Sequence, residues 1–201
     1  DSTGVFAAWG ATEALKIDVT TAEAAIASTE LMYIAQEIEG QDLQHLEWGT
    51  AGAQSVTVSF LFQSPKSGTT CVTLYEPATT GTSHIKEFTV AVADTPERFT
   101  LTFPGLTSPV LPNTNVSGLR LAFPLVAGSN YQATVDTWAV GQDYGTSNQQ
   151  NLLDSTANSV FIGQIKLEVG STATAFEHES YGDTLAKCQR YFHRVVDEAV
   201  M

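Results

Sequence analysis

The segment SVTVSFLFQ at residues 55–63 decides the fold class of this chain. Large apolar residues occupy every second position, namely Val56, Val58, Phe60 and Phe62. Most of the residues between them carry hydroxyl groups, with Leu61 as the exception. Successive side chains of a β-strand point to opposite faces of the sheet, so a period of two predicts a strand with one buried face.

The same period recurs on both sides of this segment. Clear runs lie at 99–103, 119–123 and 161–169, and weaker runs lie at 14–19, 31–38, 70–75, 85–92 and 134–140. Clusters of Gly, Pro, Asn or Asp separate most of the runs and mark turns, as in SPKSG at 64–68. About nine short strands at this spacing predict an all-β protein, a jelly-roll-like antiparallel β-sandwich.

Three segments depart from the strand pattern. Residues 40–48 predict a short helix or turn across one end of the sandwich, and residues 141–158, rich in Gly, Asn and Gln, predict a surface loop. Ser180 and Asp183 form a capping-box pattern, which predicts a short helix that ends between Cys188 and Tyr191. We expect a sandwich module over residues 1–178 and a helix with a connector to a further segment over residues 179–201.

A longer helix is the alternative for the C-terminal segment. It would align an apolar seam at spacings of four and three, made of Tyr181, Leu185, Cys188, Phe192 and Val195. Such a seam is typical of coiled coils, although this one spans barely two heptads.

The charge balance limits the possible partners. The chain of 201 residues has 22 acidic and 9 basic side chains, a net charge of −13. This surface repels phosphate groups, which argues against nucleic acid and against an anionic membrane. No apolar stretch reaches the length that spans a membrane. Cys71 and Cys188 fit no metal motif or disulfide framework, which favours synthesis in a reducing cytoplasm.

The titratable residues form no recognisable catalytic set. None of the four histidines has a zinc-ligand spacing, and neither a nucleophile elbow nor a phosphate-binding loop occurs. Glu37 with Glu39, and Glu13 with Asp18, are the acid pairs that glycoside hydrolysis would need, but exposed sheet carboxylates explain them without chemistry. We therefore expect no enzymatic activity. Asp154 and Glu168 are weak candidates for a structural calcium ion.

Aromatic residues suggest a sugar-binding surface. Trp138, flanked in sequence by Tyr131 and Tyr144, would offer an apolar ring face to the C–H face of a pyranose. Packing in the core is the alternative for any single Trp. The run at 134–140 places Trp138 with polar residues, whereas Trp9 and Trp48 lack that argument.

The last third of the chain carries a longer pattern. FIGQIKLEVG at 161–170 continues through STATAFEHES at 171–180 to YGDTLAKCQRYF at 181–192. This stretch resembles a signature of bacteriophage tail-fibre and related virion proteins, and shorter matches extend the resemblance over nearly the whole chain. Three positions depart from the family pattern: Ala175 stands where Pro is usual, Glu179 where Arg is usual, and Phe192 where Tyr is usual.

The resemblance implies a jelly roll similar to carbohydrate-binding modules, with strands before residue 1 and a segment after residue 201. It implies a non-enzymatic structural protein of a tailed-phage virion: a tail fibre, a baseplate appendage or a capsid-attached fibre. Such a protein is made in the host cytoplasm, assembles as a homotrimer, contacts other virion proteins and can bind host-surface glycans. The alternative is a carbohydrate-binding module of a secreted glycan-active enzyme, which predicts a row of Trp or Tyr on one exposed face.

Overall fold

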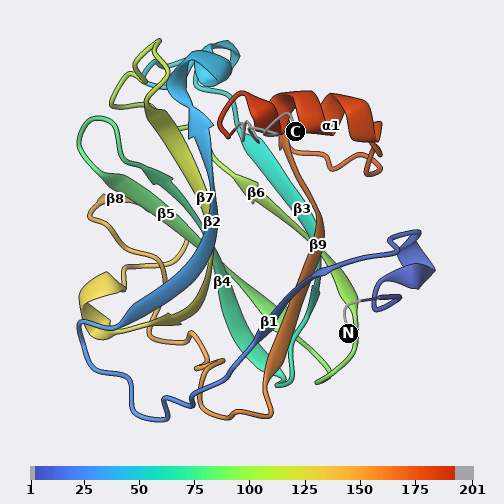
Figure 1. Ribbon diagram of the computed structural model, residues 1–201. Helices are drawn as coiled ribbons and strands as arrows, with labels where there is room; N and C mark the ends of the chain where they lie inside the picture. The colour runs from blue at the N-terminus through green and yellow to red at the C-terminus, as the bar shows by residue number, and fades with distance from the viewer. Residues whose placement is uncertain (1–2, 193–201) are drawn as a thin grey trace, which may run out of the picture.

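The computed structural model describes residues 3–192 and shows two antiparallel sheets packed face to face (Figure 1). The four-stranded sheet has the order β1 (Leu15–Asp18), β9 (Ser159–Val169), β3 (Val56–Gln63) and β6 (Glu97–Phe103). The five-stranded sheet has the order β2 (Leu31–Glu39), β7 (Ser117–Ala127), β4 (Gly68–Glu76), β5 (Thr82–Val90) and β8 (Trp138–Val140). Every predicted run overlaps one of these strands, and the predicted all-β jelly-roll sandwich is confirmed.

The core lies between the two sheets, and β3 supplies its centre. Val56, Val58, Phe60 and Phe62 all point inward and are at most 1% exposed. The Phe60 ring contacts Phe88 and Phe123 edge to face, at centroid distances of 5.2 and 5.0 Å. Burial of one such ring stabilises the fold by about 1.5–3 kcal/mol. The alternation in residues 55–63 therefore predicts the inward face correctly.

The other face of β3 is also buried, which the alternation does not predict. Thr57, Ser59 and Leu61 are at most 1% exposed, because two segments cross the outer face of the four-stranded sheet. The first is the N-terminal segment, with a short 3₁₀ helix η1 (Ala7–Trp9). Its Phe6 is buried in a cluster with Leu61 and Phe161. A Cβ atom at Gly163 would lie 2.9 Å from the Phe6 ring, so a glycine is needed beneath it.

The second covering segment follows β9, and we call residues 171–179 the strap. The Thr57 hydroxyl donates to the carbonyl oxygen of Gly170 over 2.7 Å, where the chain turns back. Further along, Lys166 Nζ donates to the carbonyl oxygen of Ala175 over 3.0 Å, and Thr174 N–H donates to Glu168 over 3.0 Å. These bonds fix the strap to the outer face of β9.

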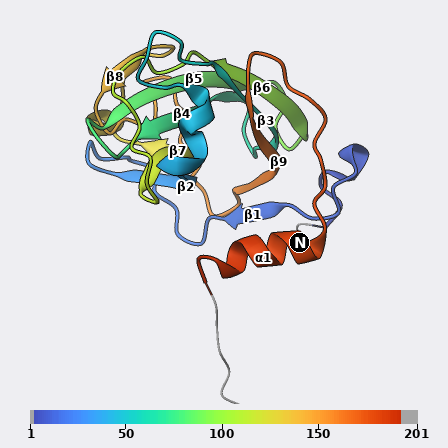
Figure 2. The same ribbon diagram turned by 90° about the horizontal axis from the view of Figure 1, so that it is seen from above.

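Three further helical segments lie outside the sheets. Two are 3₁₀ helices, η2 (Gly40–Leu46), which confirms the turn predicted at one end of the sandwich, and η3 (Ser129–Tyr131). The third is α1 (Tyr181–Gln189), whose N-terminus is capped by Ser180 Oγ, an acceptor for the Asp183 N–H at 3.2 Å. This confirms the predicted start of the helix at Ser180. Figures 1 and 2 show α1 on the outside of the sandwich, on the side of β9. Val195 of the alternative seam lies outside the described residues.

The segment 141–158 is not the simple surface loop that its sequence predicts, because part of it is buried. Its Tyr144, Thr146 and Leu152 are buried. The Thr73 hydroxyl on β4 donates to the carbonyl oxygen of Tyr144 over 2.6 Å, so this part of the segment covers the outer face of the five-stranded sheet. Beneath it, burial raises the pKa of the Cys71 thiol to about 11, as expected for a cysteine that packs rather than reacts. No helix within residues 3–192 is long and apolar enough to cross a membrane.

Candidate functional site

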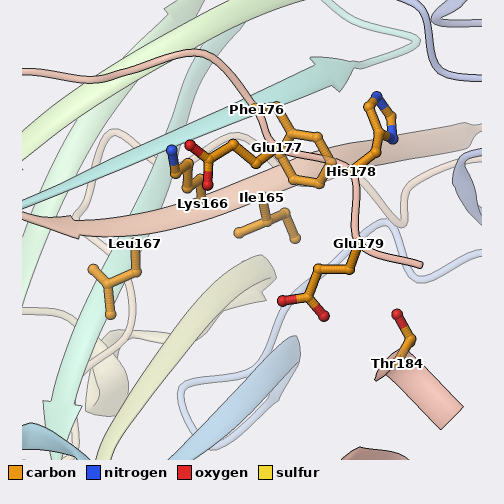
Figure 3. A pocket seen from close by; sticks show the side chains of 8 residues that line it. All are labelled: Ile165, Lys166, Leu167, Phe176, Glu177, His178, Glu179 and Thr184. Atoms are coloured by element: carbon orange, nitrogen blue, oxygen red, sulfur yellow. The ribbon is translucent and has the colours of Figure 1, made fainter. Parts of the chain in front are cut away.

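Two adjoining cavities lie beside β9, on either side of the strap. The first has a volume of about 560 Å³ and is bounded by β9, the strap and the first turn of α1. Figure 3 shows its lining side chains, with Phe176 lying over Ile165 and with Thr184 contributed by α1. The second, of about 500 Å³, shares Phe176 and His178 with the first, so the two form one groove interrupted by the strap.

We call the second cavity the Trp9 cavity. Four separate segments meet there: η1, β6, β9 and the strap. Its lining residues are Trp9, Arg98, Thr100, Gln164, Ala173, Thr174, Ala175, Phe176 and His178. It thus combines aromatic surface with amide, hydroxyl and guanidinium groups, the combination that recognises a ligand with both apolar and polar faces.

A β-bulge in β9 creates one wall of the Trp9 cavity. Ser59 and Leu61 on β3 are two residues apart, whereas their partners on β9, Lys166 and Gly163, are three apart. The extra residue is accommodated at Gln164, whose φ of 44° lies in the left-handed region that non-glycine residues avoid. Bulges turn a side chain away from the regular alternation, and strained backbone of this kind concentrates at functional sites.

The Gln164 side chain connects Trp9 with Arg98. Its Nε2 donates to the carbonyl oxygen of Trp9 over 2.9 Å, and its Oε1 accepts a hydrogen bond from Arg98 Nη2. These partners fix the orientation of the amide, since a carbonyl requires the donor end and a guanidinium the acceptor end. The bulge therefore positions both residues through one side chain.

Trp9 is the exposed tryptophan of the described chain. Trp9 is 36% exposed, whereas Trp48 is 3% exposed. The Trp9 N–H donates to the carbonyl oxygen of Phe6 over 3.0 Å, so the buried Phe6 ring anchors the turn that presents the indole. Across the cavity, Phe176 and His178 meet edge to face at 5.1 Å.

The sugar-binding residues predicted from sequence do not share one surface. Trp138 packs against Trp48 at a centroid distance of 5.5 Å, and its Nε1 donates to the carbonyl oxygen of Pro104 over 2.9 Å. Only residues 138–140 form β8, so the alternation inferred over 134–140 does not describe this segment. Tyr131 lies in η3. The assignment of Tyr144 to a sugar platform is wrong, because its ring is fully buried and stacks on Tyr33 at 4.4 Å.

A second Arg–aromatic cluster lies on the outer face of the five-stranded sheet. The Arg120 guanidinium lies 5.6 Å from the ring centroids of both Tyr33 and Tyr75. It donates to the hydroxyl of Tyr33 over 3.1 Å, and also to the Tyr144 hydroxyl and the Glu37 carboxylate. Burial alone would lower the pKa of Arg120, but the hydrogen bonds to Glu37 and Tyr144 outweigh it and raise that pKa above its ordinary range.

One of the two acid pairs considered for catalysis, Glu37 with Glu39, belongs to these structural contacts. Glu37 is bound by Arg120 and by the Ser117 hydroxyl, and Glu39 forms an ion pair with Arg190. Each carboxylate therefore has a cationic partner of its own, which accounts for the pair without chemistry.

The two carboxylates proposed for calcium do not fit a metal site. Asp154 accepts hydrogen bonds from Lys66 and Asn158, and Glu168 accepts them from Thr174 and lies 3.1 Å from Lys166. These contacts lower the pKa of both carboxyl groups. Within residues 3–192, no three His, Cys, Asp or Glu side chains gather as ligands for an ion.

Comparison with known proteins yields distant similarity of the fold. Neither a protein-family model nor a curated protein sequence matches the chain. A solved structure described as "CBM4 structure and function" is 12% identical, covers 78% of this chain and 83% of its own, and has a TM-score of 0.41. A "Family 16 Carbohydrate Binding Module-2" is 10% identical, covers 79% and 78%, and has a TM-score of 0.35. Similarity this low carries no conclusion about ligands or sites.

Proposed function

We propose that this chain is a non-catalytic module that binds glycans, and that the Trp9 cavity is its binding surface. The observation that carries the proposal is the exposed indole of Trp9, held in one cavity with Gln164 and Arg98. An indole face complements the C–H face of a sugar ring, and the neighbouring polar groups can bond its hydroxyls. Gln164 orders Trp9 and Arg98 before any ligand binds, which reduces the conformational entropy lost on binding.

The lining of the cavity supports binding rather than hydrolysis. Glycoside hydrolysis ordinarily needs two carboxyl groups about 5–10 Å apart, on either side of the scissile bond. Among the described residues that line the Trp9 cavity there is neither Asp nor Glu.

Glycan binding by the wild type and two tryptophan variants tests this proposal. A glycan array followed by calorimetry should show binding by the wild type and by Trp138→Ala. Trp9→Ala should lose at least about ten-fold in affinity, or about 1.4 kcal/mol, with its melting temperature little changed. Equal affinity of Trp9→Ala and the wild type would overturn the assignment of the site. Failure of the folded wild type to bind any glycan would overturn the function.

A structural role in a phage virion is the second candidate, and α1 supports it. The helix has nine residues, and its Tyr181 is 82% exposed and Leu185 is 38% exposed. Isolated helices of this length are marginal in water, so a partner that covers this face would stabilise it. The virion-protein resemblance is strongest in this same part of the chain. We propose that the module assembles there as a homotrimer in a fibre or similar appendage, in contact with other virion proteins.

Analytical ultracentrifugation separates this context from a module of a secreted enzyme. A virion appendage predicts a trimer for the wild type and a monomer for the double variant Tyr181→Ser/Leu185→Ser. The double variant should still bind glycans, because neither residue lines the Trp9 cavity. A monomeric wild type that binds glycans would contradict the trimer and favour the enzyme-associated module.

A further inference from the structure

Arg98 differs from the other cationic side chains of the described chain. Residues 3–192 contain eight of the nine Lys and Arg residues, since Arg194 lies outside this range. Seven of the eight form ion pairs with carboxylates. Arg98 instead bonds the neutral amide of Gln164. In a chain with 22 acidic residues, a cation that pairs with an amide calls for an explanation.

No acidic side chain is among the described residues that line the Trp9 cavity with Arg98. Its sequence neighbour Glu97 accepts a hydrogen bond from the Ala91 N–H over 3.2 Å. Glu168 lies within reach of Lys166 and Thr174. Glu177 and Glu179 line the neighbouring cavity across the strap rather than the Trp9 cavity (Figure 3). The guanidinium thus lines a cavity that supplies no counter-charge of its own.

We infer that the ligand of the Trp9 cavity carries a carboxylate, as an acidic sugar such as a uronic or sialic acid does. The sugar ring stacks on Trp9, and its carboxylate pairs with the Arg98 guanidinium. A guanidinium presents a planar fork of donors that matches a carboxylate, and Gln164 uses only one of its two Nη groups. This inference rests on the proposed glycan-binding function and specifies the ligand class of the same site.

The bulge gives this arrangement a structural basis. An exposed arginine is ordinarily free to sample many rotamers, and its ordering opposes binding. The side-chain Oε1 of Gln164 accepts a hydrogen bond from Arg98, while its Nε2 donates one to the backbone carbonyl oxygen of Trp9. The cation and the indole are therefore placed in advance as a pair, and the strained backbone of Gln164 is the local consequence.

The test compares acidic oligosaccharides with their carboxyl methyl esters and with neutral oligosaccharides of equal length. Calorimetry should show the wild type binding an acidic member at least ten-fold more tightly than its ester. Arg98→Gln removes the charge and keeps a planar amide, so it should bind acid and ester with equal affinity. Lys16→Gln, which removes an ion-paired cation elsewhere on the same sheet, is the matched control and should keep the preference.

The possible outcomes separate the two claims. Equal wild-type affinity for acid and ester would overturn the acidic-ligand inference and leave the glycan-binding function standing. A stronger preference for sulfated than for carboxylated sugars would overturn the carboxylate assignment. Retention of the acid preference by Arg98→Gln would overturn the role of Arg98. Failure of every oligosaccharide to bind the folded wild type would overturn the proposed function as well.

Discussion

The outer face of each sheet carries an arginine beside aromatic residues, but one arginine is ion-paired and covered whereas the other is exposed without a carboxylate partner among the described residues. Arg120 on the five-stranded sheet lies between tyrosine rings, is paired with Glu37 and is covered by the segment that contains Tyr144. Arg98 on the four-stranded sheet bonds a neutral amide beside an exposed indole. An arginine with aromatic neighbours is therefore structural where its charge is paired and its rings are covered. It is available to a ligand where neither condition holds.

The largest expected effect is on the covered face. Tyr144→Ala removes a fully buried ring that stacks on Tyr33 and whose hydroxyl accepts from Arg120. We expect a loss of about 3–5 kcal/mol in the free energy of unfolding, measured by urea denaturation. Arg98→Gln, a change on the open face, should alter stability by no more than about 0.5 kcal/mol. Comparable losses in both variants would show that the two faces do not differ as described.

We also expect acid to lower the free energy of unfolding through His84 on the five-stranded sheet. His84 on β5 is 1% exposed and contacts Trp138 at 5.1 Å, and neither ring nitrogen has a hydrogen-bond partner among the described residues. Burial, with Lys86 nearby, lowers the His84 pKa to about 4. Between about pH 6.5 and pH 4, His84 binds a proton in the unfolded chain but stays neutral in the folded chain. The free energy of unfolding therefore falls as pH drops from about 6.5 to 4.

The expected loss over this range is on the order of 3 kcal/mol. It is measured as the difference between urea unfolding at pH 7 and at pH 4. His84→Phe should remove most of this pH dependence, whereas His178→Phe, on the exposed strap, should leave it unchanged. A wild type equally stable at both pH values would contradict the buried neutral state of His84.

A small effect on stability, with a loss of glycan affinity, is expected for Gln164→Gly. Glycine relieves the positive φ at the bulge but removes the bonds to Trp9 and Arg98. These terms offset one another, so we expect the unfolding free energy to change by less than about 1 kcal/mol. Glycan affinity should fall several-fold, because Trp9 and Arg98 lose their common support. Unchanged affinity, measured by calorimetry, would contradict the positioning role of Gln164.

The fold could be predicted from the sequence because its main determinants are local. Alternation in β3 and its counterparts marks the inward faces, and the capping box of Ser180 and Asp183 marks the start of α1. The segments that cover the outer faces of the sheets cannot be predicted from such local patterns. The burial of Tyr144 depends on a polar segment folding onto β4, and the ion pair between Asp154 and Lys66 joins residues 88 positions apart.

The site itself was less predictable, for a related reason. Alternation cannot show that Trp9 is presented by a turn anchored through Phe6, or that Arg98 faces it from β6. Gly163 was the available signal, because a glycine within a strand often marks a bulge or a close approach of another segment. Both occur here, since Phe6 packs on Gly163 and the bulge follows at Gln164. The virion resemblance gives no indication of either feature.

The most direct test of the glycan-binding site is the ¹⁵N–¹H spectrum of the three indole N–H groups during titration with the glycan that binds best. Trp48 and Trp138 donate their indole N–H to the carbonyl oxygens of Gln54 and Pro104, so their signals should remain in place. The Trp9 signal, assigned by its absence in Trp9→Phe, should shift until the site is saturated. A shift of the Trp138 signal while the Trp9 signal stays fixed would contradict the account.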